Sequence, residues 1–116
     1  MAGKTGVVLA LYKVASENEK ALLKLLPKKR RYFLKAGYAT RRAPILLRSR
    51  QNPEIFIEIF EWKSQDAVAK AHQDPKVRAI WDEMDKLCKK IGQGLNEVPE
   101  FATSFPHFDP VDIYGK

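Results

Sequence analysis

The residue of this chain best suited to chemistry is Glu58, a carboxylate inside an apolar and aromatic run, IFIEIFEW. In an extended strand Phe56, Glu58 and Phe60 point to one face, so the aromatic neighbours would take the carboxylate out of water. Such an environment suits a general base or, when the carboxyl is protonated, a hydrogen-bond donor. The alternative is an ion pair, within the chain or between two copies, with Arg48 or Arg50. The hairpin register decides whether Arg48 shares a face with Glu58, and the sequence does not fix it.

Four further residues could contact a bound molecule. His72 comes near the end of a predicted helical segment, where it could meet a ligand at a cavity mouth or bond to the helix end. Trp81 recurs at helical spacing with other apolar residues, which favours core packing over a ligand platform. Tyr12 and Trp62 could line a pocket between helix and sheet or fill it. We therefore predict Glu58 and His72 as catalytic residues and a ligand pocket formed by Tyr12, Arg48, Phe60, Trp62 and Trp81.

The sequence argues against metal and cofactor chemistry. The two histidines, His72 and His107, and the single cysteine, Cys88, do not fall at metal-ligand spacing. No glycine-rich phosphate loop occurs, and no serine or cysteine nucleophile arrangement can be assembled. We expect no metal, no cofactor and no internal disulfide, and we expect Cys88 to be a small buried apolar residue.

The apolar spacing predicts the elements that position these residues. Gly6–Val14 reads as a strand rich in β-branched and aromatic residues. Ser16 is expected to cap a helix that starts at Glu17 and kinks or restarts at Pro27. Gly37 is a natural terminator of that helix, because glycine readily adopts the left-handed conformation found there.

A hairpin and a second helix are predicted next. Thr40–Arg50 and Ile55–Trp62 read as strands joined by a four-residue turn, so they should pair antiparallel. Ser64 is expected to cap the helix that follows. Asp74-Pro75 should interrupt that helix and restart it, with the aspartate as cap and the proline at the first helical position.

Gly92 should end the second helix, and one short strand near Phe101–Phe105 completes a β-α-β-β-α-β order. This order is that of a ferredoxin-like α+β domain, in which two helices cover one face of an antiparallel sheet. We expect one domain over residues 1–116, with a core from about residue 6 to 106 and a C-terminal extension at 107–116.

The predicted strands are apolar on both faces. The runs GVVLALYK and IFIEIFEW place apolar residues at nearly every position. Two helices can cover only one face of the sheet, and leaving the other in water is unfavourable by roughly 25 cal/mol per Å². We therefore predict a homodimer in which the sheet of a second copy covers that face.

At this point the sequence resembles a known family. The stretch EIFEWKSQDAVAKAH (Glu58 to His72), with the later Asp74-Pro75 and Trp81, is similar to the antibiotic-biosynthesis-monooxygenase-like branch of the dimeric α+β barrel superfamily. The resemblance covers roughly residues 7 to 105. It implies a ferredoxin-like domain whose sheet faces that of a second copy. For activity it implies a cofactor-independent monooxygenase acting on an apolar aromatic substrate.

The same superfamily includes haem-degrading enzymes, whose second helix carries an axial histidine and a nearby tryptophan. Aligned on Trp62, those places fall near Trp81 and Ala71 of this chain. Neither residue type matches, and His72 lies beside the tryptophan place. The resemblance therefore does not extend to haem degradation.

Two functions of other classes remain open, a non-catalytic binding or structural module of this fold and an RNA-binding domain. The chain is basic, with a net charge of +7, and many of its cations, Lys29 among them, lie between Lys24 and Arg42. We expect these residues to form a solvated face with weak affinity for nucleic acid. The RNA-recognition module of the same element order carries a glycine-containing motif on its third strand, and Ile55–Trp62 has no glycine. RNA binding is the least favoured of the three functions.

The compartment is suggested by weaker signals. A lone cysteine suits a reducing environment. No secretory leader is recognisable, and no apolar stretch approaches the ~20 residues of a membrane span. We expect a cytoplasmic protein with no membrane partner.

Overall fold

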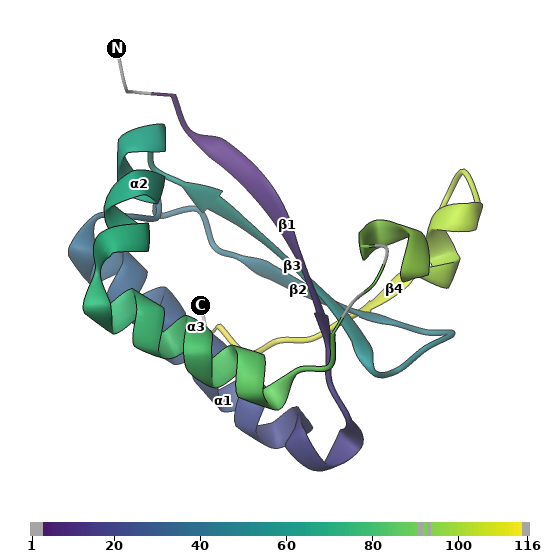
Figure 1. Cartoon of the computed structure of the whole chain (residues 1–116). Helices are drawn as coiled ribbons and strands as arrows, with labels where there is room; N and C mark the ends of the chain where they lie inside the picture. Colours follow the sequence, from purple (N-terminus) through teal and green to yellow (C-terminus); the bar gives the residue numbers. More distant parts are fainter. Residues whose placement is uncertain (1–3, 91, 93, 115–116) are drawn as a thin grey trace.

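The structure is a computed structural model that describes residues 4–90, 92 and 94–114. Its elements are β1 (Gly6–Lys13), α1 (Ser16–Ala36), β2 (Ile45–Ser49), β3 (Ile55–Trp62), α2 (Gln65–Gln73), α3 (Pro75–Leu87), the 3₁₀ helices η1 (Gly94–Glu97) and η2 (Pro99–Ala102), and β4 (Phe108–Pro110) (Figure 1). The strands form one sheet in the order β1-β3-β2-β4, and every pair in it is antiparallel. The predicted ferredoxin-like α+β arrangement is confirmed.

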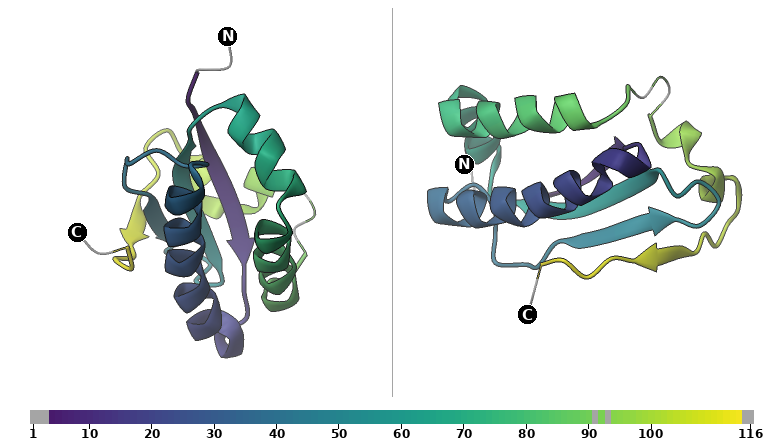
Figure 2. Two further views of the ribbon diagram at one scale, coloured as in Figure 1. Left: turned by 90° about the vertical axis from the view of Figure 1, so that its left-hand side faces the viewer. Right: turned by 90° about the horizontal axis from the view of Figure 1, so that it is seen from below.

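The helices lie together on one face of the sheet, with α1 and α3 side by side (Figure 2). The core between them is built by apolar residues at helical spacing, because i, i+3 and i+4 positions share a face. Leu22, Leu25 and Leu26 of α1 are buried there against Phe56 of β3 and Met84 of α3. Polar groups that face this layer are therefore enclosed between helices and sheet.

Several predicted local signals are confirmed. Gly37 ends α1 with a φ of 82°, the left-handed conformation that favours glycine. The Ser64 side chain accepts a hydrogen bond from the backbone N–H of Ala67 at the start of α2. Asp74 caps α3 through the N–H of Lys76, with proline in the first turn. The predicted antiparallel hairpin of β2 and β3 forms, but β2 is shorter than the predicted strand Thr40–Arg50 and residues 50–54 join the two strands.

The predicted start and restart of the first helix are wrong. Ala15 occupies the N-cap position without a side-chain hydrogen bond, and the helix begins at Ser16. The helix also continues through Pro27. Buried residues lie on both sides of the proline, Leu26 before it and Phe33 after it. Their packing on the sheet keeps the chain helical on both sides of the proline and outweighs the one backbone bond that proline removes.

The predicted end of the second helix at Gly92 is also wrong, because α3 ends at Leu87. Cys88 forms an isolated antiparallel bridge with Val14, and the N–H of Lys89 donates to the carbonyl of Lys13 over 2.6 Å. The chain therefore leaves the helix to pair briefly with the end of β1. This pairing satisfies backbone groups that another helical turn would have used.

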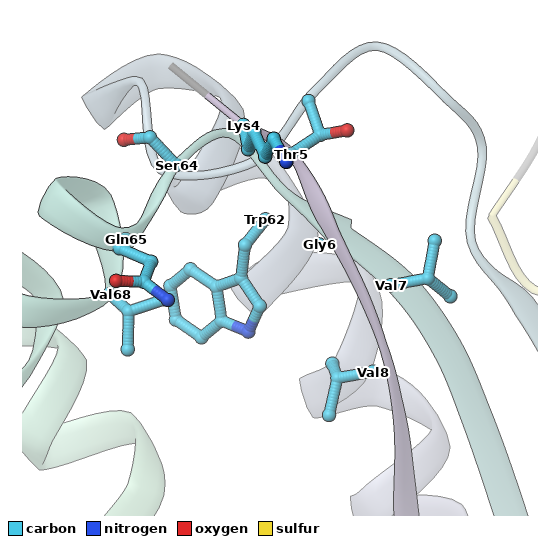
Figure 3. Close-up of a pocket in the computed structure, with 9 residues that line it drawn as sticks. All are labelled: Lys4, Thr5, Gly6, Val7, Val8, Trp62, Ser64, Gln65 and Val68. Carbon is cyan, nitrogen blue, oxygen red and sulfur yellow. The ribbon is translucent and has the colours of Figure 1, made fainter. Parts of the chain in front are cut away.

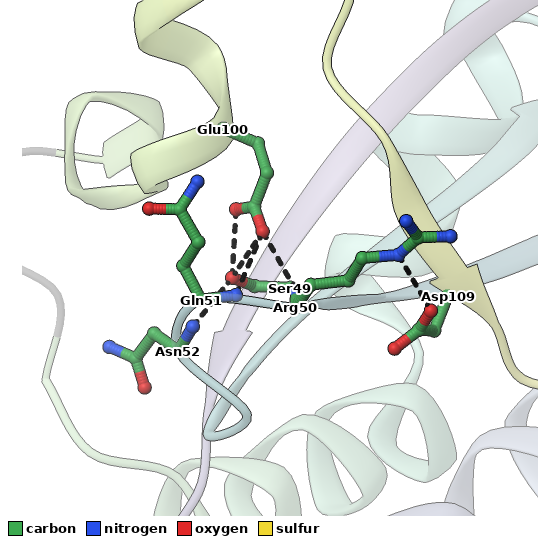
Figure 4. A network of polar contacts seen from close by, with 6 residues as sticks. All are labelled: Ser49, Arg50, Gln51, Asn52, Glu100 and Asp109. Carbon is green, nitrogen blue, oxygen red and sulfur yellow. Dashed lines mark hydrogen bonds and ion pairs between the residues drawn. The ribbon is translucent and has the colours of Figure 1, made fainter.

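No strand forms at Phe101–Phe105, where one was predicted. Residues 99–102 form η2, and the last strand, β4, comes later and pairs with β2. The buried carboxylate of Glu100 explains this, since it accepts from the Ser49 hydroxyl over 2.8 Å and from the N–H groups of Arg50 and Gln51 over 2.7 and 3.0 Å (Figure 4). Burial raises the pKa of Glu100, but these donors outweigh it and hold that pKa below its usual range. The 3₁₀ helix η2 thus stabilises the β2–β3 turn through Glu100.

The helix-free face of the sheet is covered only in part. Val98 of the segment between η1 and η2 is buried against Ile55 and Ile57, so the chain itself covers one end of this face. At the other end Val7 is 58% exposed and Ile45 52% exposed. The prediction that a second copy must cover the whole face was therefore wrong in extent. An apolar patch of Val7, Leu9 and Ile45 remains.

Among the described residues, no helix combines the length and apolar character that crossing a membrane requires.

Candidate functional site

The centre of the site is the Glu58 carboxylate, which is buried beneath the helices and 1% exposed. Its Oε1 atom accepts from the ammonium of Lys29 over 2.6 Å and from the hydroxyl of Tyr12 over 2.7 Å. Its Oε2 atom accepts from the hydroxyl of Tyr114. Three donors from three separated parts of the chain thus converge on one carboxylate.

Lys29 reaches Glu58 because it stands on the buried stripe of α1. It follows Leu25 by four residues and precedes Phe33 by four, so all three side chains share one helical face. Its side chain is only 4% exposed. The ammonium also lies 4.4 Å from the ring centroid of Phe60, a cation–π contact that further favours the buried charge.

Tyr12 reaches Glu58 through the register of the sheet. Its backbone partner on β3 is Phe56, two residues before Glu58, so the two side chains lie diagonally on the same face. Burial, and then the negative charge of Glu58, raise the pKa of Tyr12 well above its usual value. The same two causes raise the pKa of Tyr114. Both phenols therefore keep their protons and donate them to the carboxylate.

A pocket of about 510 Å³ opens beside this group, between β1, α1 and α3. Lys29 and Tyr12 form its polar wall, while Glu58 lies behind them and does not line it. Its remaining lining is mostly apolar and aromatic at the centre and basic at one end, and consists of Val8, Ala10, Leu11, Lys13, Phe60, Trp62, Trp81, Met84, Asp85, Cys88, Lys89 and Lys90. We call this the central pocket.

A second pocket, of about 560 Å³, lies between the start of β1 and α2 and shares Val8 and Trp62 with the central pocket. Figure 3 shows the Trp62 indole between Gln65 and Val68 of α2 and the first residues of β1. Its lining holds no carboxylate, imidazole or thiol. Although it is slightly larger, the titratable side chain of its lining is Lys4, whereas the central pocket combines Lys29 and Tyr12 with the Glu58 carboxylate behind them.

The structure brings four of the predicted pocket residues to the central pocket, namely Tyr12, Phe60, Trp62 and Trp81. Arg48 shares the helix-facing side of the sheet with Glu58 but forms an ion pair with Glu19 and stacks over Phe56. The prediction that Arg48 or Arg50 pairs with Glu58 is therefore wrong. Arg50 pairs with Asp109 at the surface, and the partner of Glu58 is Lys29.

The structure does not bring His72 to the central pocket. Its side chain is exposed, and its Nδ1 atom lies 2.8 Å from the carbonyl oxygen of Val68, one turn earlier in α2. The imidazole packs edge-on against Trp81, with ring centroids 5.0 Å apart. This is the helix-end geometry that the sequence left open as the alternative to a ligand contact.

Two residues that donate hydrogen bonds to Glu58, Lys29 and Tyr114, were missed in the sequence. Lys29 was assigned to the solvated basic face, although its place on the leucine stripe of α1 was a signal that it turns inward. Tyr114 gave no signal, because it stands in a short segment of mixed polarity after the last strand. Cys88, predicted to be buried, is half-buried, and this burial raises its pKa.

Within the described part of the chain, no group of three or more histidine, cysteine, aspartate or glutamate side chains could hold a metal ion. The polar groups at the central pocket are the buried ammonium of Lys29, the phenol of Tyr12 and the Glu58 carboxylate behind them.

Comparison with known proteins supports the fold. No family sequence model matches the chain, and no curated protein matches it. Among solved structures, the fold is similar to one described as "Putative antibiotic biosynthesis monooxygenase from Nitrosomonas europaea". The TM-score is 0.62 at 13% identity, over 78% of this chain and 86% of the other. At this identity the likeness shows the fold, which is the one that the sequence resemblance implied.

Proposed function

We propose that the chain binds a hydroxylated aromatic molecule in the central pocket and oxidises it as a cofactor-independent monooxygenase. The observation that carries this proposal is the Lys29–Tyr12–Glu58 group, in which Lys29 and Tyr12 line an aromatic pocket and both contact the buried Glu58 carboxylate behind them. The sequence resemblance and the described activity of the structural neighbour point the same way.

The pocket suits such a ligand in size and lining. Its volume of about 510 Å³ falls within the range typical of small-molecule sites. Phe60, Trp62 and Trp81 offer ring faces and edges for stacking with an aromatic body. A ligand hydroxyl directed at the polar wall would meet Tyr12 and Lys29.

The polar wall can move a proton away from such a hydroxyl. The ligand proton passes to the Tyr12 oxygen as the Tyr12 proton passes to Oε1 of Glu58, 2.7 Å away, so Tyr12 stays protonated. The result is a ligand oxyanion and a neutral carboxylic acid. Lys29 contacts Glu58 over 2.6 Å and Tyr12 over 3.4 Å, so its ammonium stabilises the negative charge at either end of the transfer.

An oxyanion formed in this way makes the ring electron-rich enough to reduce oxygen itself. The enol tautomer of an anthrone, for example, has such a hydroxyl, and loss of its proton gives the enolate. The enolate transfers electrons to O₂, and a peroxide forms at the carbon that is CH₂ in the keto tautomer. Loss of water from the peroxide leaves a carbonyl group, so one O₂ converts CH₂ into C=O and H₂O. The residues of this chain supply the proton transfer and the charge stabilisation.

Oxygen uptake tests this proposal. Anthrone should consume one O₂ per molecule faster with the protein than without it, in the presence of a chelator. Tyr12→Phe keeps the ring and removes the relay oxygen, so we expect kcat to fall by roughly 100-fold or more. Tyr38→Phe is the matched control, because it also removes a tyrosine hydroxyl from a carboxylate, that of Asp74, but Tyr38 does not line the central pocket, and it should leave the rate unchanged.

Two outcomes would contradict the proposed monooxygenase activity or its mechanism. Binding of anthrone without oxygen uptake above the protein-free rate favours the non-catalytic binding module. An unchanged rate in Tyr12→Phe removes the relay from the mechanism, whatever the activity of the wild type.

We also propose that the chain is a homodimer. The patch of Val7, Leu9 and Ile45 lies on the helix-free face of the sheet, and each of these side chains is more than two-fifths exposed. Burying this patch against the same patch of a second copy removes apolar surface from water. Light scattering after gel filtration should give twice the 13.3 kDa chain mass, and Leu9→Lys should reduce it to one chain. A wild-type monomer at micromolar concentration contradicts this assembly.

A further inference from the structure

We infer that the C-terminal segment 111–114, here called the tail, is a displaceable internal ligand, and that a free monocyclic phenol binds Oε2 of Glu58 in place of Tyr114. The inference shares Glu58 with the proposed function but concerns the opposite side of the carboxylate from the central pocket.

The attachment of the tail differs from that of the other donors on Glu58. Tyr12 and Lys29 belong to β1 and α1, so neither can leave without disrupting the core. Tyr114 follows β4 and lies in no helix or strand. In the described part of the tail, the hydrogen bonds to the rest of the chain are those of the Val111 N–H to the Leu46 carbonyl and of the Tyr114 hydroxyl to Glu58. A segment that lies outside the helices and strands and is held by two such hydrogen bonds opens at little free-energy cost.

The tail also lies over a space that can accept a ligand. A pocket of about 480 Å³ is formed on one side by residues 43–46, before and within β2, and on the other by residues 110–114. Val111, Ile113 and Tyr114 pack against the edge of the core cluster that contains Leu46. Withdrawal of the tail would enlarge this pocket and open it toward Glu58.

The chemistry left behind by Tyr114 specifies the ligand class. Oε2 of Glu58 is buried and needs a hydrogen-bond donor when Tyr114 leaves. A second cation is not required, because Lys29 already balances the charge. Apart from Asp112 and Tyr114 itself, the side chains that line this pocket are apolar, so the body of the ligand should be an uncharged ring. Arg30 acts on Tyr114 electrostatically from outside this lining. A neutral aromatic ring with one hydroxyl meets all three requirements, and the Tyr114 side chain is itself such a group.

The test uses p-cresol, which reproduces the tyrosine side chain, and toluene, which lacks the hydroxyl. Affinities are measured by calorimetry for wild type, Tyr114→Phe and Tyr114→Ala. Tyr114→Phe keeps the ring of the tail and removes its hydrogen bond, so p-cresol should bind about tenfold tighter than to wild type. Tyr114→Ala should bind p-cresol tighter still and prefer it to toluene by about tenfold or more.

Tyr38→Phe is the matched control. It also removes a tyrosine hydroxyl from a carboxylate, that of Asp74, but at a site away from the tail. It should leave the affinity for p-cresol unchanged. In wild type, the Tyr114 ring signals in a ¹H–¹³C NMR spectrum should move to the positions of a solvated tyrosine as p-cresol saturates the protein.

Equal affinities of wild type and Tyr114→Phe for p-cresol, or Tyr114 signals that stay fixed at saturation, would overturn the inference and identify the tail as a permanent structural tie. These readouts do not depend on turnover. If the protein drives oxygen uptake but p-cresol does not displace the tail, the proposed function is supported and this inference is refuted. If p-cresol displaces the tail but no oxygen uptake is seen, this inference is supported and the proposed function is not.

Discussion

Removal of Lys29 is the change whose effect on stability follows most directly from the structure. Its ammonium and the Glu58 carboxylate are 2.6 Å apart, and their side chains are 4% and 1% exposed. In Lys29→Met the carboxylate keeps the two tyrosine donors but loses its counter-charge. Breaking a buried pair by removing one partner typically costs about 3–5 kcal/mol.

For a domain of 116 residues, 1 kcal/mol corresponds to roughly 4 °C in Tm, so Lys29→Met should melt about 12–20 °C below wild type. Glu58→Gln should cost a similar amount, because it leaves the ammonium without its partner. The double variant removes both charges and keeps an acceptor oxygen for the tyrosines. The unfolding free energy that the double variant loses should therefore be smaller than the sum of the losses in the two single variants, by about 2 kcal/mol or more.

Unfolding by guanidinium at fixed protein concentration, followed by circular dichroism, gives these free energies. Arg50→Met is the matched control, because the Arg50–Asp109 pair has a similar separation of 2.8 Å but side chains that are 55% and 53% exposed. It should cost less than about 1 kcal/mol. A loss of under about 1 kcal/mol for Lys29→Met as well would refute the reasoning that the pair is desolvated.

Three further predictions concern other parts of the chain. Tyr32 and then Tyr38 donate to Asp74 and lower its pKa, so the stability from this carboxylate is present above the unfolded pKa and lost as pH falls through the folded one. The gap in urea midpoint between wild type and Asp74→Asn should therefore narrow from about pH 7 to about pH 3. Glu100→Gln replaces a carboxylate that accepts hydrogen bonds from three donors by a weaker acceptor and should lower the stability by about 1–3 kcal/mol, measured in the same way, whereas a neutral change would mean that the β2–β3 turn holds without it. Binding of RNA or DNA, measured by fluorescence anisotropy, should be weak, independent of sequence and lost with added salt, and sequence-specific binding at physiological salt would contradict a solvated basic face.

The fold could be predicted from the sequence where local signals agreed with the tertiary structure. The hairpin, the cap at Ser64 and the Asp74-Pro75 restart all depend on residues close together in the chain, and all three are confirmed. The prediction failed where distant residues decide. Glu100 turns the expected last strand into a 3₁₀ helix by binding the turn at Ser49, and nothing near Glu100 in the sequence indicates this contact.

The candidate site shows the same division. Glu58 was recognisable as a buried carboxylate because its neighbours on the strand are aromatic. Its partner Lys29 was not recognisable, because a lysine inside a basic run is expected to be solvated. Only its position on the apolar stripe of the helix indicates that its side chain points inward. Tyr114 could not be predicted, because the path of the chain after β4 depends on packing against β2.

The central claim is that Lys29 and Tyr12 promote ionisation of a hydroxyl group bound in the central pocket. The most direct measurement is a pH titration of bound 2-naphthol, whose neutral and ionised forms differ in absorbance. The account predicts that bound 2-naphthol ionises at a lower pH than the free compound, and that Tyr12→Phe reduces the shift. Bound 2-naphthol that ionises at the same pH as the free compound, or at a higher one, would contradict it.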